Sequence, residues 1–134
     1  MSEPGFTVGR IVPDLVTERL SELADFYADI FGLDTNMDQG WVRSLGPCGG
    51  GGELIIMAAA EVEDPVPMMS IGVDDVDAAY ARARAADATI VYEITDEPWG
   101  VRRFFLADPD GRVVNVVGHH PSSEAENVEA VAHR

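Results

Sequence analysis

The chain has 134 residues, 46% of them hydrophobic, a size that favours one compact domain or two very small halves. Asp and Glu number 24 against nine basic residues, and the net charge of −15 argues against nucleic acid and anionic membranes as partners. No apolar run approaches the roughly 20 residues of a membrane span, and no secretory signal opens the chain. The lone Cys48 excludes an internal disulfide. From these three observations we expect a cytoplasmic protein.

The first half of the chain predicts a strand, a helix and three short strands. The strand covers residues 6–16, and Thr17 is the expected N-cap of a helix that runs from Glu18 to Phe31 and ends at Gly32. Apolar residues recur along this helix at i, i+3, i+4, i+7 spacing, which predicts one apolar stripe of Leu20, Leu23, Ala24, Tyr27, Ile30 and Phe31. The three short strands follow at residues 33–37, 41–45 and 53–58. The glycine run 49–52 leads into a strand rather than a helix, which favours a hairpin tip over a phosphate-binding loop.

The second half repeats this order after a linker. Residues 61–67 contain two prolines and three acidic residues without periodicity, as a linker would. A strand is expected at residues 68–73, then a helix from Val76 to Ala86 capped by Asp74 or Asp75, and a strand at 89–94. Residues 121–134 are expected to form an acidic tail.

A hairpin ends the second half. Residues 101–107 and 112–117 are rich in β-branched and aromatic residues, and Asp108-Pro109-Asp110-Gly111 between them is a strong turn signal. With Pro109-Asp110 as the tip, Ala107 pairs with Arg112, so Phe104 lies opposite Asn115. Alternation then predicts one face with Arg102, Phe104 and Asn115, and the opposite face with Arg103 and Phe105.

The repeated order predicts an α+β fold of two β-α-β-β-β modules in a single domain, residues 1–120. Module one covers about residues 6–60 and module two about residues 68–120. The two expected helix ends, Gly32 and Asp87, are similarly placed in their modules, which indicates internal duplication.

The chain resembles the vicinal oxygen chelate superfamily of glyoxalases, extradiol dioxygenases and bleomycin-resistance proteins. The resemblance lies in this order of elements and in three stretches of sequence: DFYADIFGL, VDDVDAAYARA and FLADPDGRVVN. The resemblance implies curved mixed sheets that form a cleft, a homodimer that completes it, and a divalent metal in the enzymes. It places the metal-ligand positions near Val12, at Met68 and at Asn115, and these are poor ligands for a hard cation. We therefore expect no metal, no cofactor and no catalytic residue. His119 and His120 are adjacent and would point to opposite faces of a strand.

The resulting hypothesis is a metal-independent protein that binds an aromatic or cationic small molecule, as the bleomycin-resistance branch does. The residues expected to bind the ligand are Trp99, Arg102, Phe104, Asn115, Met68, Ser70 and Trp41. The alternatives are a glyoxalase-like lyase or isomerase or a dioxygenase with a non-standard metal site, and a dimerisation or regulatory module. Each tryptophan could equally fill the core.

Overall fold

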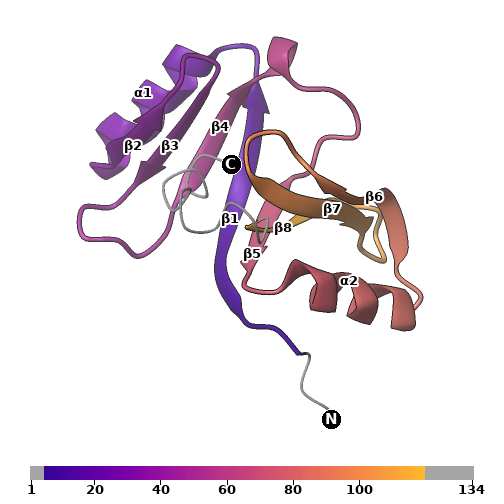
Figure 1. The fold of residues 1–134 in the computed structure, drawn as a ribbon. Helices are drawn as coiled ribbons and strands as arrows, with labels where there is room; N and C mark the ends of the chain where they lie inside the picture. The colour runs from indigo at the N-terminus through magenta and orange to yellow at the C-terminus, as the bar shows by residue number, and fades with distance from the viewer. Residues whose placement is uncertain (1–4, 120–134) are drawn as a thin grey trace. The chain divides into compact units, whose positions relative to one another are not determined.

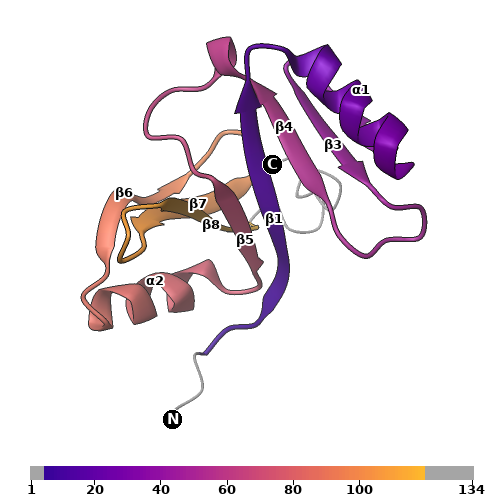
Figure 2. The same ribbon diagram turned by 180° about the vertical axis from the view of Figure 1, so that it is seen from behind.

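The computed structural model describes residues 5–119, and these form eight strands and two α-helices (Figures 1 and 2). The first five elements are β1 (Val8–Thr17), α1 (Leu20–Phe31), β2 (Asp34–Asp38), β3 (Val42–Gly46) and β4 (Leu54–Ala58). A short 3-10 helix at Ala59–Glu61 precedes β5 (Met69–Val73), α2 (Val76–Ala85), β6 (Thr89–Asp96), β7 (Val101–Ala107) and β8 (Val113–His119). The predicted α+β fold with two β-α-β-β-β modules is confirmed. The predicted tail lies outside the described residues.

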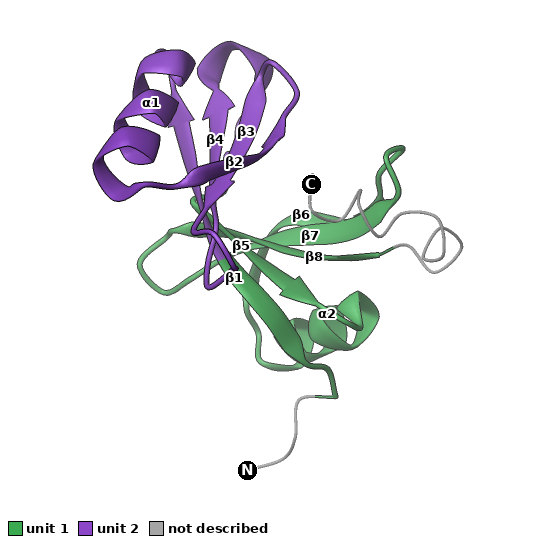
Figure 3. Ribbon diagram, turned by 90° about the vertical axis from the view of Figure 1, so that its left-hand side faces the viewer, with its two compact units in different colours: residues 1–11, 67–134 green, residues 12–66 purple. Residues whose placement is uncertain are grey.

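The described residues divide into two compact units, shown in different colours in Figure 3. Unit 2 is the continuous segment 12–66, and unit 1 joins residues 5–11 to residues 67–119. Each unit repeats one topology, in which the first strand of the module pairs in parallel with the last: β1 with β4, and β5 with β8. The remaining pairs, β2–β3–β4 and β6–β7–β8, are antiparallel. The first residues of β1 lie beside β5, so this strand contributes to both units.

Helix α1 covers one face of the unit 2 strands with part of the predicted apolar stripe: Leu20, Leu23, Ala24 and Tyr27. The expected burial of Ile30 and Phe31 in the same stripe is wrong, because these residues at the end of the helix lie outside that apolar cluster and are each 62% exposed. Its Ala24 is buried against Leu45 of β3 and Ile56 of β4. The expected N-cap is wrong by two residues, because the helix begins after Arg19 and the Thr17 hydroxyl instead accepts the Arg19 N–H at 2.9 Å. Gly32 ends the helix in the left-handed conformation, as predicted.

Helix α2 packs on one face of the unit 1 strands. Asp75 caps it, since the Asp75 carboxylate accepts the Ala78 N–H at 3.0 Å. The core beneath the helix is apolar and consists of Val73, Val76, Ala79, Ala83, Phe104, Val114 and Val116. Within residues 5–119, neither helix is long and apolar enough to cross a membrane.

The β7–β8 turn differs from the expected one by a single residue. Asp108 and Arg112 form the closing pair, with the Asp108 N–H donating to the Arg112 carbonyl at 2.9 Å, so the loop has three residues rather than two. Gly111 supplies the left-handed φ of 87° that such a loop requires. Ala107 therefore pairs with Val113, and the expected pairing with Arg112 is wrong.

The shifted register separates two residues that we expected on one face. Phe104 lies opposite Val116 and packs into the core under α2, whereas Asn115 lies opposite Phe105. Phe104 and Asn115 are therefore on opposite faces of the unit 1 sheet. The prediction that they share a ligand-binding face is wrong.

The Asp108 carboxylate makes the stability of this turn depend on pH. The backbone N–H of Arg112, and after it that of Asp110, donate to the Asp108 carboxylate and hold its pKa below the usual range, against the opposing effect of burial. A lowered folded-state pKa stabilises the fold above the unfolded pKa, and this stabilisation is lost as pH falls through the folded value. We expect Asp108→Asn to be less stable than wild type at neutral pH, with the difference vanishing as the pH falls below the folded-state pKa of Asp108. Urea unfolding from neutral to acidic pH measures this difference in the free energy of unfolding. A difference that persists in acid would contradict the prediction, and so would a loss equal to that of Asp110→Asn.

Candidate functional site

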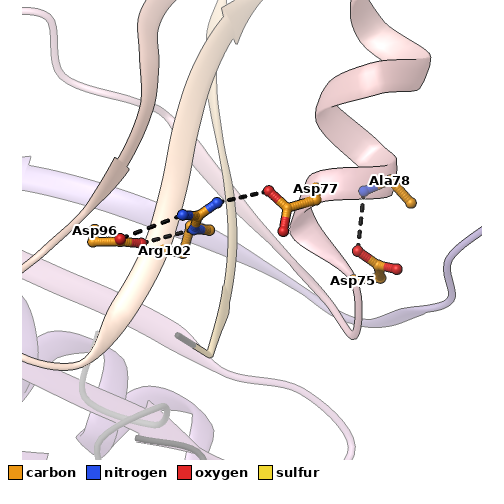
Figure 4. A network of polar contacts seen from close by, with 5 residues as sticks. All are labelled: Asp75, Asp77, Ala78, Asp96 and Arg102. Carbon is orange, nitrogen blue, oxygen red and sulfur yellow. Dashed lines mark hydrogen bonds and ion pairs between the residues drawn. The ribbon is translucent and has the colours of Figure 1, made fainter. Parts of the chain in front are cut away.

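Arg102, one of the expected ligand-binding residues, is held on the helix side of unit 1. Its guanidinium donates to Asp96 of β6 and to Asp77 of α2, each at 2.7 Å (Figure 4). Hydrogen bonding to Asp96, together with that to Asp77, raises the Arg102 pKa although burial opposes it. Arg102 therefore joins a helix to two strands, and the structure separates it from Asn115.

On the helix-free face of unit 1, Asn115 of β8 lies beside Ser70 of β5. The two residues are in register, and both are 3% exposed. The Asn115 Nδ2 donates to the Ser70 hydroxyl at 3.0 Å. The Asn115 Oδ1 is buried and has no hydrogen-bond partner among the described residues. The structure thus brings these two expected site residues together and leaves the Asn115 Oδ1 without a donor among the described residues.

An arginine-centred aromatic stack occupies the same face. The Arg103 guanidinium carbon lies 5.6, 5.3 and 5.0 Å from the ring centroids of Tyr92, Trp99 and Phe105. Its Nε is 2.7 Å from the Glu97 carboxylate, which also accepts the Tyr92 hydroxyl at 2.7 Å. These residues, with Ser70 and Asn115, are called here the Asn115 face: Ser70, Tyr92, Glu97, Trp99, Arg103, Phe105 and Asn115.

The β6–β7 turn that presents Trp99 repeats the geometry of the β7–β8 turn. Glu97 and Val101 close a three-residue loop, as Asp108 and Arg112 do, with the Glu97 N–H donating to the Val101 carbonyl at 2.8 Å. Gly100 ends this loop with a φ of 101°. Trp99 therefore lies at the exposed middle of a tight turn, and it is 47% exposed.

Two other expected site residues lie away from this group. Met68 is 45% exposed and precedes β5. Trp41 belongs to unit 2, where it precedes β3 and is 41% exposed. The helix-free face of unit 2 instead buries two polar residues, Asp14 and Ser44, and the Ser44 hydroxyl donates to the Glu53 carboxylate.

The donor set does not fit a divalent metal. Val12 is packed in an apolar cluster of unit 2, and the polar group facing Asn115 is the Ser70 hydroxyl. Within residues 5–119, no group of three or more His, Cys, Asp or Glu side chains is placed to hold a metal ion. One amide oxygen and one hydroxyl are weak ligands for a hard cation, and the Glu97 carboxylate of the same face is already held by Arg103 and Tyr92.

The comparisons with known proteins agree with the fold. A protein from Legionella pneumophila named as an NAD-dependent benzaldehyde dehydrogenase has a TM-score of 0.69 at 16% identity, covering 82% of this chain and 99% of that one. A glyoxalase/bleomycin resistance protein/dioxygenase superfamily member from Vibrio splendidus 12B01 has a TM-score of 0.63 at 19% identity, covering 84% and 99%. A methylmalonyl-CoA epimerase in complex with methylmalonyl-CoA and NH4+ has a TM-score of 0.58 at 20% identity, covering 84% and 96%.

At these identities the solved structures show a shared fold alone. No curated protein matches the sequence significantly. The family model of the Glyoxalase/Bleomycin resistance protein/Dioxygenase superfamily matches residues 7–116, most of the chain. The chain therefore belongs to the glyoxalase/bleomycin resistance protein/dioxygenase superfamily.

Proposed function

We propose that this superfamily member binds an organic small molecule on the Asn115 face without a metal ion. The observation that carries the proposal is the buried Asn115 Oδ1, which has no partner among residues 5–119. A buried acceptor without a donor costs about 1–3 kcal/mol, so structures seldom keep one without a reason. A ligand N–H or O–H that reaches this oxygen would recover that free energy.

The charges on the Asn115 face favour a neutral ligand over an ionic one. Arg103 and Glu97 form an ion pair whose Glu97 side chain is only 9% exposed, so their charges cancel locally. The Tyr92 hydroxyl already donates to the same carboxylate. Among the described residues of this face, the neutral Asn115 Oδ1 is left without a hydrogen-bond partner, and it matches a neutral donor such as an amide. The net charge of −15 still attracts cations to the protein as a whole.

Ring surface for an aromatic ligand is also available. Trp99 is half-exposed while its ring contacts Arg103, so one part of the indole is free to stack. Because Asn115 is 3% exposed, binding requires the side chains around it to shift. We expect the ligand to contact Trp99 and Asn115 together, rather than the set expected from the sequence.

We also propose that the protein forms a homodimer. Its open sheets have strand edges at β2 and β6 that a second copy could cover. Sedimentation at tens of micromolar protein tests this, and only monomer at moderate salt contradicts it. The enzymatic alternative needs a metal site, and the donor set described above does not favour one.

Three compounds of one shape test the binding proposal: benzamide, benzamidine and benzoate. They present a neutral donor, a cationic donor and an anion without a donor. Each compound is titrated in EDTA, and binding is followed by tryptophan fluorescence in a Trp41→Phe background. We expect benzamide to bind at millimolar concentration and benzoate not to bind. Trp99→Ala, read by calorimetry, should weaken benzamide binding by about tenfold.

Asn115→Leu is the sharpest variant because it keeps the branched side-chain shape and removes the open acceptor. We expect it to abolish benzamide binding with little change in stability, since the lost hydrogen bond to Ser70 is offset by removal of an unsatisfied polar atom. Urea unfolding supplies the stability readout. Binding that survives in Asn115→Leu, or that appears only with an added divalent metal, would overturn the proposal. Tighter binding of benzamidine would reject only the neutral ligand class.

A further inference from the structure

Helix α1 of unit 2 leaves large apolar side chains uncovered. Phe26 is 52% exposed, and Ile30 and Phe31 are each 62% exposed. Phe26 and Ile30 are one helical turn apart, so they form a continuous apolar row along the side of the helix. The Tyr27 ring joins Phe26 to Phe31, with centroids 5.1 and 6.1 Å away. Single exposed apolar residues are common on surfaces, but two large neighbours along one side of a helix, Phe26 and Ile30, indicate an interaction surface.

The charged side chains of α1 beside this row are acidic, and Arg19, just before the helix, forms an exposed ion pair with Glu22 at 3.9 Å. Exposed Glu22, Asp25 and Asp29 lie on α1, and the helix contains no basic residue. Asp25 and Asp29 are four residues apart, a spacing at which like charges destabilise a helix. Asp29 also lies in the last turn, where the helix dipole is negative and favours cations. A cation docked here would relieve both repulsions.

A second copy of the chain is a poor source of that cation. All nine basic residues are arginines, and Arg134 lies outside the described residues. Five of the eight others form ion pairs: Arg19, Arg43, Arg102, Arg103 and Arg112. Arg84 lies over the Tyr80 ring, and Arg10 and Arg82 have polar or ring interactions of their own. Two copies meeting at α1 would also bring their acidic rows together.

We propose that the outer side of α1, formed by Glu22, Asp25, Phe26, Asp29 and Ile30, docks a segment of another protein that presents apolar side chains flanked by lysine or arginine. The Phe26–Ile30 row supplies the apolar contact, and the acidic row beside it selects for basic flanks. This surface lies in unit 2 and is independent of the Asn115 face.

The test uses a labelled helical peptide of leucine and lysine, compared with the same peptide carrying glutamate in place of lysine. Fluorescence anisotropy should show binding of the basic peptide alone. Phe26→Ser/Ile30→Ser should weaken it by about tenfold or more, since buried apolar contacts dominate such interfaces. Asp25→Asn/Asp29→Asn should weaken it by about three- to fivefold at low salt.

Matched variants separate docking from general attraction to an acidic protein. Glu61→Gln/Glu63→Gln removes the same charge from the exposed linker and should leave peptide affinity unchanged, as should Val91→Ser at an exposed apolar position of unit 1. Circular dichroism confirms that the α1 variants stay folded. Equal losses of peptide affinity in Asp25→Asn/Asp29→Asn and in Glu61→Gln/Glu63→Gln would overturn the proposal. So would sedimentation showing that Phe26→Ser/Ile30→Ser abolishes self-association, which would assign the surface to a second copy.

Discussion

Replacing Phe104 by alanine should lower the free energy of unfolding by about 3–5 kcal/mol, the usual cost of emptying a large aromatic site in a core. Phe104 is completely buried in unit 1. Its ring meets the Tyr80 ring of α2 edge-on at 4.9 Å, so the substitution removes both buried area and an aromatic pair. Urea unfolding followed by circular dichroism measures the change.

The control is Phe26→Ala, which removes the same atoms from a ring that is 52% exposed and should cost less than about 1 kcal/mol. If Phe104→Ala were as stable as this control, Phe104 would not be a core residue. The comparison also tests the corrected register. Had Phe104 faced a ligand, its loss would weaken binding and leave the fold largely intact.

Removing the Arg103 charge should have the second-largest effect. We expect Arg103→Met to destabilise the protein by about 2–4 kcal/mol, because the Glu97 carboxylate is nearly buried and would keep its charge without a counter-ion. The three ring contacts of the guanidinium would be lost as well. Thermal and urea unfolding of the variant provide the measurement.

Two further variants show whether the destabilisation comes from the lost Arg103–Glu97 ion pair or from the lost ring contacts of the guanidinium. Glu97→Gln in the Arg103→Met background should recover part of the loss, because it removes the unpaired charge. Arg112→Met breaks an exposed ion pair with Asp110 and should cost less than about 1 kcal/mol. An Arg103→Met variant no less stable than Arg112→Met would show that the stack contributes little.

The order of elements could be predicted from the sequence because each element carries a local signal. Gly32 ends the first helix, Asp75 caps the second, and the Asp108-Pro109-Asp110-Gly111 turn separates the last two strands. These signals depend on backbone conformation within a few residues. They locate helices and strands well, and they place strand ends less well: β6 extends to Asp96 and β8 to His119, both beyond the predicted limits.

The site depended on the register of one hairpin, and here the sequence is ambiguous. Arg102-Arg103 and Phe104-Phe105 are two pairs of identical neighbours, so a slip of one residue leaves each face with one arginine and one phenylalanine. The apolar pattern could not distinguish the two registers. A signal did exist in Gly111, whose position fits a three-residue loop with a left-handed glycine at its end.

Other parts of the Asn115 face arise from contacts that no local pattern reports. Tyr92 and Arg103 meet Glu97 because two strands and a turn converge. The sequence identified Trp99, Ser70 and Asn115 as candidates. It could not show that the Asn115 oxygen is buried without a donor, since burial is a property of the assembled unit.

The division of β1 between the units has a consequence for how the chain folds during its synthesis. Unit 2 is one continuous segment, so it can form as soon as residues 12–66 have left the ribosome. Residues 5–11 belong to unit 1, where Thr7 exchanges hydrogen bonds with Asp74, and they must wait for strands made much later. Residues 5–11, which emerge before unit 2, are therefore among the last of the described residues to find their partners. In a nascent chain halted after residue 66, β1 could pair with β4 through residues 14–17, while residues 8–11 of the same strand would still lack their partners in unit 1.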